Sequence, residues 1–287
     1  MEYLDLKIFF SIFVWVYCNV ISLLVKTLYH IISFVLLFLF VSCGIKLKQN
    51  DDGANGRIEV KRYDRIETRY LTTGDFAALQ QLNTDYPRET RILIEDVLQL
   101  GEISDPEINS KFLNYYQDTL LQKIISDVEL QYADMSDINK QFKKAFKKLR
   151  ELIPGVKVPY IYSQIGSLDQ SVIVVDGAIG IFLDKYLGAD YPIYKKYYTQ
   201  KQCKFMSREY IVSDCISFYL LSLYPYKSVK SPSRKGREIH AAKIMWAVNK
   251  VAGRNVFNTD YVNKIDKYMK SHGDVTLDEL LKSGDIV

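Results

Sequence analysis

Histidine is scarce in this sequence, and its scarcity narrows the chemistry that the protein can perform. Only three histidines occur among 287 residues. A zinc-peptidase helix carries two histidines four positions apart, with a glutamate after the first, and the sequence contains no such pair. His240 and His272, which follow the apolar N-terminus, lie in an amphipathic helix pattern and before a glycine, respectively. Both positions are typical of structural histidines, so neither predicts a catalytic triad.

Other features of common sites are also missing. The sequence has no phosphate-binding glycine loop and no dinucleotide fingerprint. Its formal net charge is +4, which is too weak to indicate a nucleic-acid partner. Hydrophobic residues make up 48% and charged residues 25%, which excludes wholesale disorder. We therefore expect a folded protein that has no nucleic-acid partner and binds no metal or cofactor.

Cysteine is scarce too, with four residues in the chain. Cys203 and Cys215 are twelve positions apart and could form a disulfide in an oxidising compartment. Cys215 falls within an apolar helix pattern, however, and nothing places Cys203 opposite it. The sequence leaves the bridged and the free forms open.

Long apolar runs are present only at the N-terminus. Ile8–Val25 and residues 27–45 contain no acidic residue, lysine or arginine, and Lys26 alone separates them. Each run could be considered for spanning a bilayer, but a single residue cannot reverse the chain between two spans. Lys26 followed by the apolar residues 31–41 is typical of a secretory signal, with a short basic region and an h-region.

The second run ends in Phe40-Val41-Ser42-Cys43-Gly44. This segment resembles a bacterial lipobox, in which the cysteine is acylated and becomes the mature N-terminus, although Phe40 stands where leucine is usual. We therefore predict a signal peptide over residues 1–42, lipidation (palmitate) at Cys43 and a polar tether over residues 43–56. Gly44 stands where inner-membrane retention favours aspartate, so we expect a periplasm-facing anchor in the outer membrane. The alternative is an uncleaved membrane helix.

Residues 57–287 predict a single α+β domain that is mostly helical, with a small antiparallel sheet of three to four strands. An edge strand is expected over 57–64, followed by a helical half. The expected helices cover 75–82, 91–100, 112–130 with one break, and 136–152. An antiparallel meander follows over 158–165, 171–176 and 178–184. Helices resume over 207–223, 233–251 and 260–270, and a capping box at Thr276 opens the last helix.

Charged residues on or beside an apolar helix pattern are the first candidate site. Arg208, Glu209 and Asp214 lie at the start of such a helix, where charges need partners. One interpretation is a structural ion-pair network with Asp184 or Lys185. The other is a hydrolase that uses Asp184, Glu209 and Asp214 as acid and base, with or without a metal.

Two surfaces are candidates for interaction. Tyrosines are concentrated between residues 191 and 198, and Tyr194, Tyr197, Tyr198 and the nearby Arg208 are candidate contact residues for a protein or glycan partner. Residues 136–152 predict an amphipathic helix with a basic face. That face is typical of an ordinary solvated surface, with an anionic lipid or acidic partner as the alternative.

Several segments together resemble the GldB family of gliding-motility-associated lipoproteins. They are Arg62-Tyr63-Asp64, residues 159–163, residues 183–188, Tyr194, Met206 and residues 208–214. The resemblance covers most of residues 57–250. It implies a membrane-anchored lipoprotein that binds another protein of the cell-envelope machinery, for gliding or secretion.

The GldB family is itself similar to a group of predicted zinc metallopeptidases, so the resemblance also implies a metallopeptidase-like scaffold. If Glu209 corresponds to the glutamate of their His-Glu-x-x-His motif, Arg208 and Val212 occupy the histidine positions. Neither residue is a zinc ligand. The resemblance therefore implies a non-catalytic accessory protein, with a peptidase-like hydrolase near Glu209 as the alternative.

Overall fold

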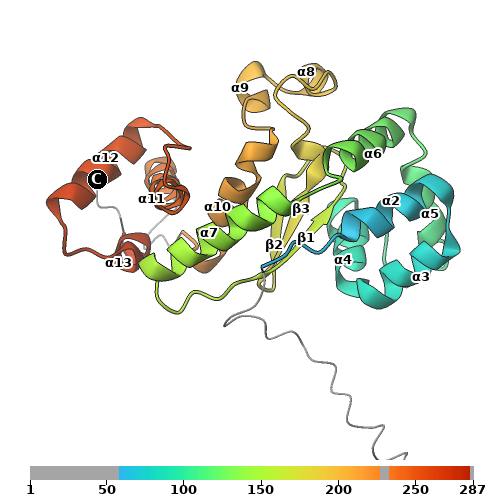
Figure 1. Ribbon diagram of the computed structural model, residues 1–287, viewed down its shortest axis with the longest axis horizontal. Coiled ribbons are helices and arrows are strands. Elements are labelled where there is room, and N and C mark those ends of the chain that lie inside the picture. The colour runs from blue at the N-terminus through green and yellow to red at the C-terminus, as the bar shows by residue number, and fades with distance from the viewer. Residues whose placement is uncertain (1–57, 227–232, 285–287) are drawn as a thin grey trace, which may run out of the picture. The chain divides into compact units, whose positions relative to one another are not determined.

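The computed structural model describes residues 58–226 and 233–284, which belong to one compact unit from Asn55 to Val287. Helices pack around a small sheet (Figure 1), so the predicted α+β class is confirmed. The predicted signal peptide, Cys43 and the tether lie outside the described residues. None of the helices within the described ranges is both long and apolar enough to cross a membrane.

The first half of the unit is helical, as expected. Its elements are α2 (Tyr63–Thr73), α3 (Phe76–Asp85), α4 (Pro87–Arg91), the π-helix η2 (Ile92–Val97), α5 (Ile108–Tyr115), α6 (Thr119–Gln131) and α7 (Ser136–Leu152). Aspartates cap two of these helices: Asp75 accepts from the backbone N–H of Ala77, and Asp118 accepts from Leu120 and Leu121. The break that was predicted within residues 112–130 lies at residues 116–118, between α5 and α6.

The strand expected over residues 57–64 is wrong. Helix α2 already begins at Tyr63, and within the described residues 58–64 only Lys61 pairs with the sheet, through an isolated parallel bridge to Tyr162. The reason lies in the side chains of α2. Tyr63, Glu67, Tyr70 and Leu71 are all buried, and this spacing of three and four residues is that of a helix with one face in the core.

The sheet has the three predicted strands in an order that differs from the prediction. β1 (Tyr160–Gln164), β2 (Val172–Val175) and β3 (Ala178–Phe182) are arranged as β1-β3-β2. β3 is antiparallel to β2 but parallel to β1, so the antiparallel meander is wrong. A two-residue turn at Asp176 and Gly177, both with positive φ, joins β2 to β3, and the other edge of β3 is left for β1.

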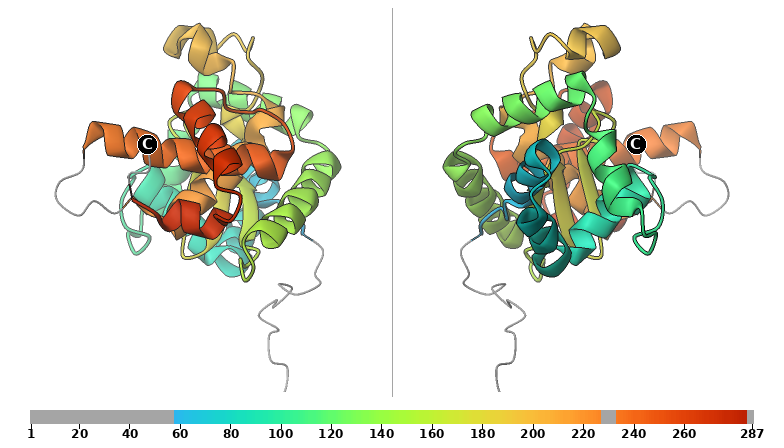
Figure 2. Two further views of the ribbon diagram at one scale, coloured as in Figure 1. Left: turned by 90° about the vertical axis from the view of Figure 1, so that its left-hand side faces the viewer. Right: turned by 90° about the vertical axis from the view of Figure 1, so that its right-hand side faces the viewer.

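The second half begins with the 3-10 turn η3 (Leu183–Lys185) and the short helices α8 (Tyr194–Tyr197) and α9 (Gln200–Cys203). The remaining elements are the 3-10 turn η4 (Arg208–Tyr210) and the helices α10 (Ile211–Leu223), α11 (Arg234–Ala252), α12 (Asp260–Ser271) and α13 (Leu277–Lys282). α10 contacts the sheet and α7, and α11 packs against α10, α12 and α13. Figures 1 and 2 show α2–α5 and α11–α13 at opposite ends, with the sheet between them and α8 and α9 projecting above it.

Two sequence predictions about helices are confirmed in detail. The capping box of α13 is complete, because Thr276 and Glu279 each accept from the other's backbone N–H. In α7, the residues of the apolar stripe are buried and the lysines face outward.

Cys203 and Cys215 are both buried and free, so the pair is not bridged.

Candidate functional site

Asp184, the first of the predicted site carboxylates, lies in η3 directly after β3 and is fully buried. Its two oxygens accept hydrogen bonds from the backbone N–H groups of Gly166 and Leu168, each at 2.8 Å. Burial raises the pKa of Asp184 to about 6, although these hydrogen bonds lower it in part. The carboxyl group therefore fixes the loop that follows β1.

The neighbours of Asp184 fix the same region. The hydroxyl of Tyr194 donates to the carbonyl of Asp184 and accepts from the N–H of Leu187 at 2.9 Å. Lys185 donates to the carbonyl of Leu168 at 2.8 Å and lies 4.0 Å from the centre of the Tyr198 ring. Tyr194 is buried and Tyr198 also donates to the Leu168 carbonyl. The described contacts of both tyrosines are therefore within the protein.

Asp214, the second carboxylate, lies in the first turn of α10. The hydroxyl of Tyr186 donates to its Oδ2 at 2.8 Å. Burial raises the pKa of Asp214 to about 6, and the hydrogen bond from Tyr186 lowers it only in part. The structure thus gives this charge a partner, but the partner is a tyrosine and not the ion-pair network that the sequence suggested.

Glu209, the third carboxylate, is on the surface. Its side chain is 61% exposed and its Oε2 lies 3.3 Å from Nη1 of Arg254, which also donates to the Glu209 carbonyl at 2.9 Å. Asp184, by contrast, is inside the core. Each of the three carboxylates thus has its own donors, and this arrangement does not favour the acid–base pair that the hydrolase hypothesis requires.

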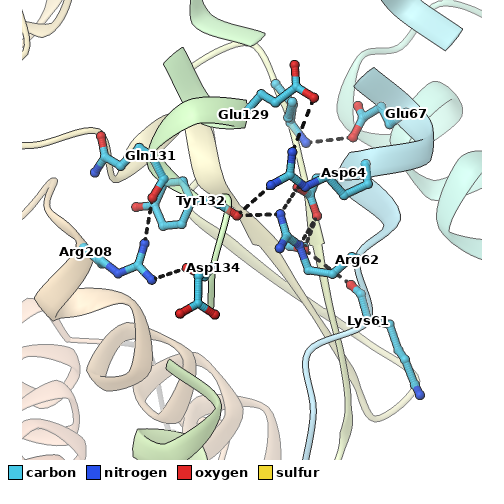
Figure 3. Close-up of polar contacts among 12 residues, drawn as sticks. Lys61, Arg62, Asp64, Glu67, Glu129, Gln131, Tyr132, Asp134 and Arg208 are labelled. Carbon is cyan, nitrogen blue, oxygen red and sulfur yellow. Dashed lines mark hydrogen bonds and ion pairs between the residues drawn. The ribbon is translucent and has the colours of Figure 1, made fainter. Parts of the chain in front are cut away.

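Arg208 binds the connection between α6 and α7, and not Asp184 or Lys185 as one interpretation expected. It forms a bidentate ion pair with Asp137, with a shortest distance of 2.5 Å. It also donates to the carbonyls of Gln131 and Asp134, at 3.0 and 2.6 Å (Figure 3). Its guanidinium lies 4.9 Å from the centre of the Tyr132 ring.

Two more arginines reach the same connection from α2 and the residue before it. Arg62 donates to the carbonyl of Tyr132 at 2.8 Å (Figure 3), and Arg65 donates to the same carbonyl at 3.0 Å. Arg62 is held in turn by a bidentate pair with the buried Asp64, at 2.7 and 2.9 Å. We call Arg62, Arg65 and Arg208 the arginine clamp. Arg62 and Arg65, at the start of α2, and Arg208, in η4, together bind the backbone carbonyls of residues 131–134.

A buried polar cluster lies behind the clamp. Ser163 on β1 donates to Asp64, and Glu67 accepts from the N–H of Ile165 at 2.9 Å. The second oxygen of Glu67 and the side-chain amide of Gln164 have no hydrogen-bond partner among the described residues. Burial raises the pKa of Glu67 well above its usual range. Sequence reasoning missed this cluster, although Arg62 and Asp64 were among the residues that carried the family resemblance.

An open groove of about 490 Å³ lies beside the tyrosine-rich segment. We call it the α6 groove, and its lining is Lys123, Asp127, Leu130, Gln131 and Tyr191. Tyr191 donates to Asp127 at 2.7 Å, and Lys123 pairs with the same carboxylate at 2.8 Å. Leu130 is 76% exposed. Of the predicted contact tyrosines, only Tyr197 is largely exposed, at 61%.

The two described histidines have local partners. His240 contacts the carbonyl of Tyr224 at 2.8 Å, and His272 stacks on the ring of Tyr268 at 4.2 Å. Within residues 58–226 and 233–284, no group of three histidines, cysteines or carboxylates is arranged to hold a metal ion.

A family model described as gliding motility protein GldB matches residues 46–254, which is well over half of the 287 residues. Searches of curated proteins and of solved structures found no match. The matched segment includes the arginine clamp, the sheet and the α6 groove. The chain therefore belongs to the family of the gliding motility protein GldB.

Proposed function

We propose that this protein is a lipoprotein of the cell envelope that is anchored through Cys43, faces the periplasm and binds another component of gliding or secretion-type machinery. The observation that carries the proposal is the family match over residues 46–254, directly after the lipobox-like sequence at Cys43. Gly44 favours the outer membrane. The separate, internally paired carboxylates Asp184, Glu209 and Asp214 favour binding over hydrolysis.

Lipidation is tested with Cys43→Ser and, as a matched control in the same apolar region, Cys18→Ser. Cells are labelled with radioactive palmitate, and the intact mass of the membrane-extracted protein is measured. We expect a chain that begins at an acylated Cys43, and a label that is lost in Cys43→Ser but kept in Cys18→Ser. A chain that begins near Met1, or a label that survives Cys43→Ser, contradicts the anchor.

The α6 groove supports the binding role. Leu130 is an apolar side chain that is 76% exposed. Tyr191 and Gln131, which line the same groove, provide an aromatic ring and hydrogen-bonding groups. Apolar anchors with a polar rim are typical of protein interfaces. Tyr197 on the projecting α8 provides a second exposed ring.

The binding surface is tested with Leu130→Ser and with Phe76→Ser as a control, because Phe76 on α3 is exposed to a similar degree, 75%. Envelope proteins are cross-linked to the anchored protein in intact cells and then identified. We expect Leu130→Ser to lose one reproducible cross-linked protein that Phe76→Ser retains. Equal recovery with both variants would remove the α6 groove from the proposal and leave the anchor untouched.

A further inference from the structure

A second cleft, of about 660 Å³, lies between the end of α11 and α12. This α11–α12 cleft is lined by Trp246, Asn249, Lys250, Gly253, Arg254, Asn255, Phe257, Asn258, Val262, Asn263, Asp266 and Lys270. Its volume is within the range of small-molecule sites in proteins, about 300–1,000 Å³. The residues from Asn255 onward lie beyond the segment that the family model matches, and Arg254 connects the cleft with Glu209 of the site described above.

Cations outnumber carboxylates in the cleft. Asp266 is the single acidic residue in the lining, against Lys250, Lys270 and Arg254. The two lysines share Asp266, at 3.1 and 2.7 Å. Arg254 pairs with Glu209, which lies outside the lining, so a positive charge remains even when Glu209 is counted. Hydrogen bonds from Lys270, Trp246 and Lys250 hold the pKa of Asp266 well below its usual range. The surplus positive charge of the cleft attracts an anion.

Asparagines supply the remaining polar groups. Asn249 builds the wall, because its side chain accepts from the N–H groups of Val256 and Phe257 and donates to the Phe257 carbonyl. Asn263 donates to Asn258 at 3.1 Å, which leaves the amino group of Asn258 available. The Asn255 side chain makes no hydrogen bond within the described part of the chain and is exposed. Amides both donate and accept, so they suit hydroxyl groups.

We propose that the α11–α12 cleft binds a sugar that carries a carboxylate or a phosphate. The lysines and Arg254 would hold the anionic group, and Asn255 and Asn258 would bind the ring hydroxyls. The indole of Trp246 forms part of the wall and donates to Asp266 at 2.9 Å. A bare inorganic ion would leave most of the cleft and its amides unused, and a neutral sugar would not use the surplus charge.

The test uses the membrane-extracted protein in detergent. Trp246 is the only tryptophan beyond the predicted signal peptide, and Trp15→Phe removes the other of the two from any chain that keeps residues 1–42. The fluorescence of Trp246 is titrated with trigalacturonate, glucose 1-phosphate, neutral trigalactose and inorganic phosphate. We expect at least one of the two anionic sugars to bind at least tenfold more tightly than trigalactose and than inorganic phosphate. The two anionic sugars distinguish a carboxylate from a phosphate as the recognised group.

Lys270→Gln and Lys267→Gln complete the test, because both change one lysine on α12 but only Lys270 lines the cleft. We expect Lys270→Gln to weaken binding of the anionic sugar about tenfold, as for the loss of one charged hydrogen bond, and Lys267→Gln to leave it unchanged. The proposal is overturned if neither anionic sugar binds, if trigalactose or phosphate binds as tightly, or if both lysine variants bind alike.

Discussion

At the scale of single residues, the carboxyl groups of this protein divide into two kinds with opposite effects on stability. Asp184 and Asp214 are placed where burial raises the pKa of each to about 6. Asp266 lies among three donors that lower its pKa. A carboxyl group of the first kind binds its proton more tightly in the folded protein than in the unfolded chain. A carboxyl group of the second kind binds it less tightly.

Asp214→Asn tests the first kind. The folded pKa of Asp214, about 6, exceeds its ordinary value of 3.8, so the folded state binds the proton more tightly than the unfolded state. The contribution of Asp214 to the unfolding free energy is therefore full below about pH 4 and is lost as the pH rises to about 6. Asparagine can still accept from Tyr186 and does not ionise. We expect the variant to gain up to about 3 kcal/mol relative to the wild type between pH 4 and pH 7, measured by urea unfolding.

Asp266→Asn serves as the control of opposite sign. The pKa of Asp266 is lower in the folded protein than its ordinary value of 3.8. Ionised Asp266 therefore stabilises the folded protein at pH values above 3.8, and this contribution is lost as the pH falls below that value. We expect the asparagine variant to lose stability relative to the wild type at pH 7 and to approach it at low pH. If both variants change with pH in the same direction, the assignment of Asp214 is wrong.

The site residues were predictable only in part. Charges beside the apolar pattern of α10 require partners, and in the structure Arg208 and Asp214 each have one. Their partners could not be deduced, because Asp137 and Tyr186 come close only through the packing of α6, α7 and η3. Glu209 was singled out by the same argument, yet it lies in η4 at the surface, where it pairs with Arg254.

At the scale of elements, the middle strand β3 is buried along its whole length. Gly180 lies opposite Tyr162 on β1 and Ile173 on β2. A Cβ at Gly180 would lie 2.7 Å from the Tyr162 ring and 2.8 Å from Ile173. The Tyr162 ring is buried and packs edge-on against Tyr63, so it has little room to move.

Gly180→Ala is therefore expected to destabilise the protein by about 1–3 kcal/mol, the usual cost of overpacking a core. The matched control is Gly273→Ala, where a Cβ would meet nothing within 4 Å. Thermal unfolding of both variants measures the difference. A Gly180→Ala variant as stable as Gly273→Ala would show that the sheet can open at this point.

Sequence predicted the elements better than their arrangement. Caps and turn residues are local, so the starts of α3, α11 and α13 and the β2–β3 turn could be deduced. The pairing of β1 with β3 could not, because it joins strands that are not consecutive in the chain. The hydrogen bonds of the loop after β1 to Asp184, which lies beyond β3, are likewise not local. Helix α2 was missed because the alternating residues 57–64 predicted a strand. The buried residues of α2 nevertheless have the spacing of a helix.

At the scale of the whole molecule, the family match ends at Arg254, whereas the fold continues through α12 and α13. These helices join the same core: Leu277, Leu280 and Leu281 are buried. The buried Lys243 of α11 also donates to the carbonyls of Ser283 and Gly284. We therefore expect the C-terminal helices to unfold together with the sheet.

Leu280→Ala tests this expectation. Loss of a buried leucine side chain should lower the unfolding free energy by about 2–5 kcal/mol and shift a single transition. Lys282→Ala, at an exposed position of the same helix, should have little effect. Fluorescence of Trp246 and far-ultraviolet circular dichroism follow the transition. A separate early transition in Leu280→Ala would show that α13 is an independent attachment.

The strand order also has a consequence for export. β3 lies in the middle of the sheet, but it is the last of the three strands in chain order. In the export proposed above, the chain crosses the membrane from its N-terminus, so β1 and the residues of α2 that rest on it have no central strand to join until Phe182 has crossed. We therefore expect the sheet to close late in export, and the exported chain to depend on periplasmic chaperones until it does.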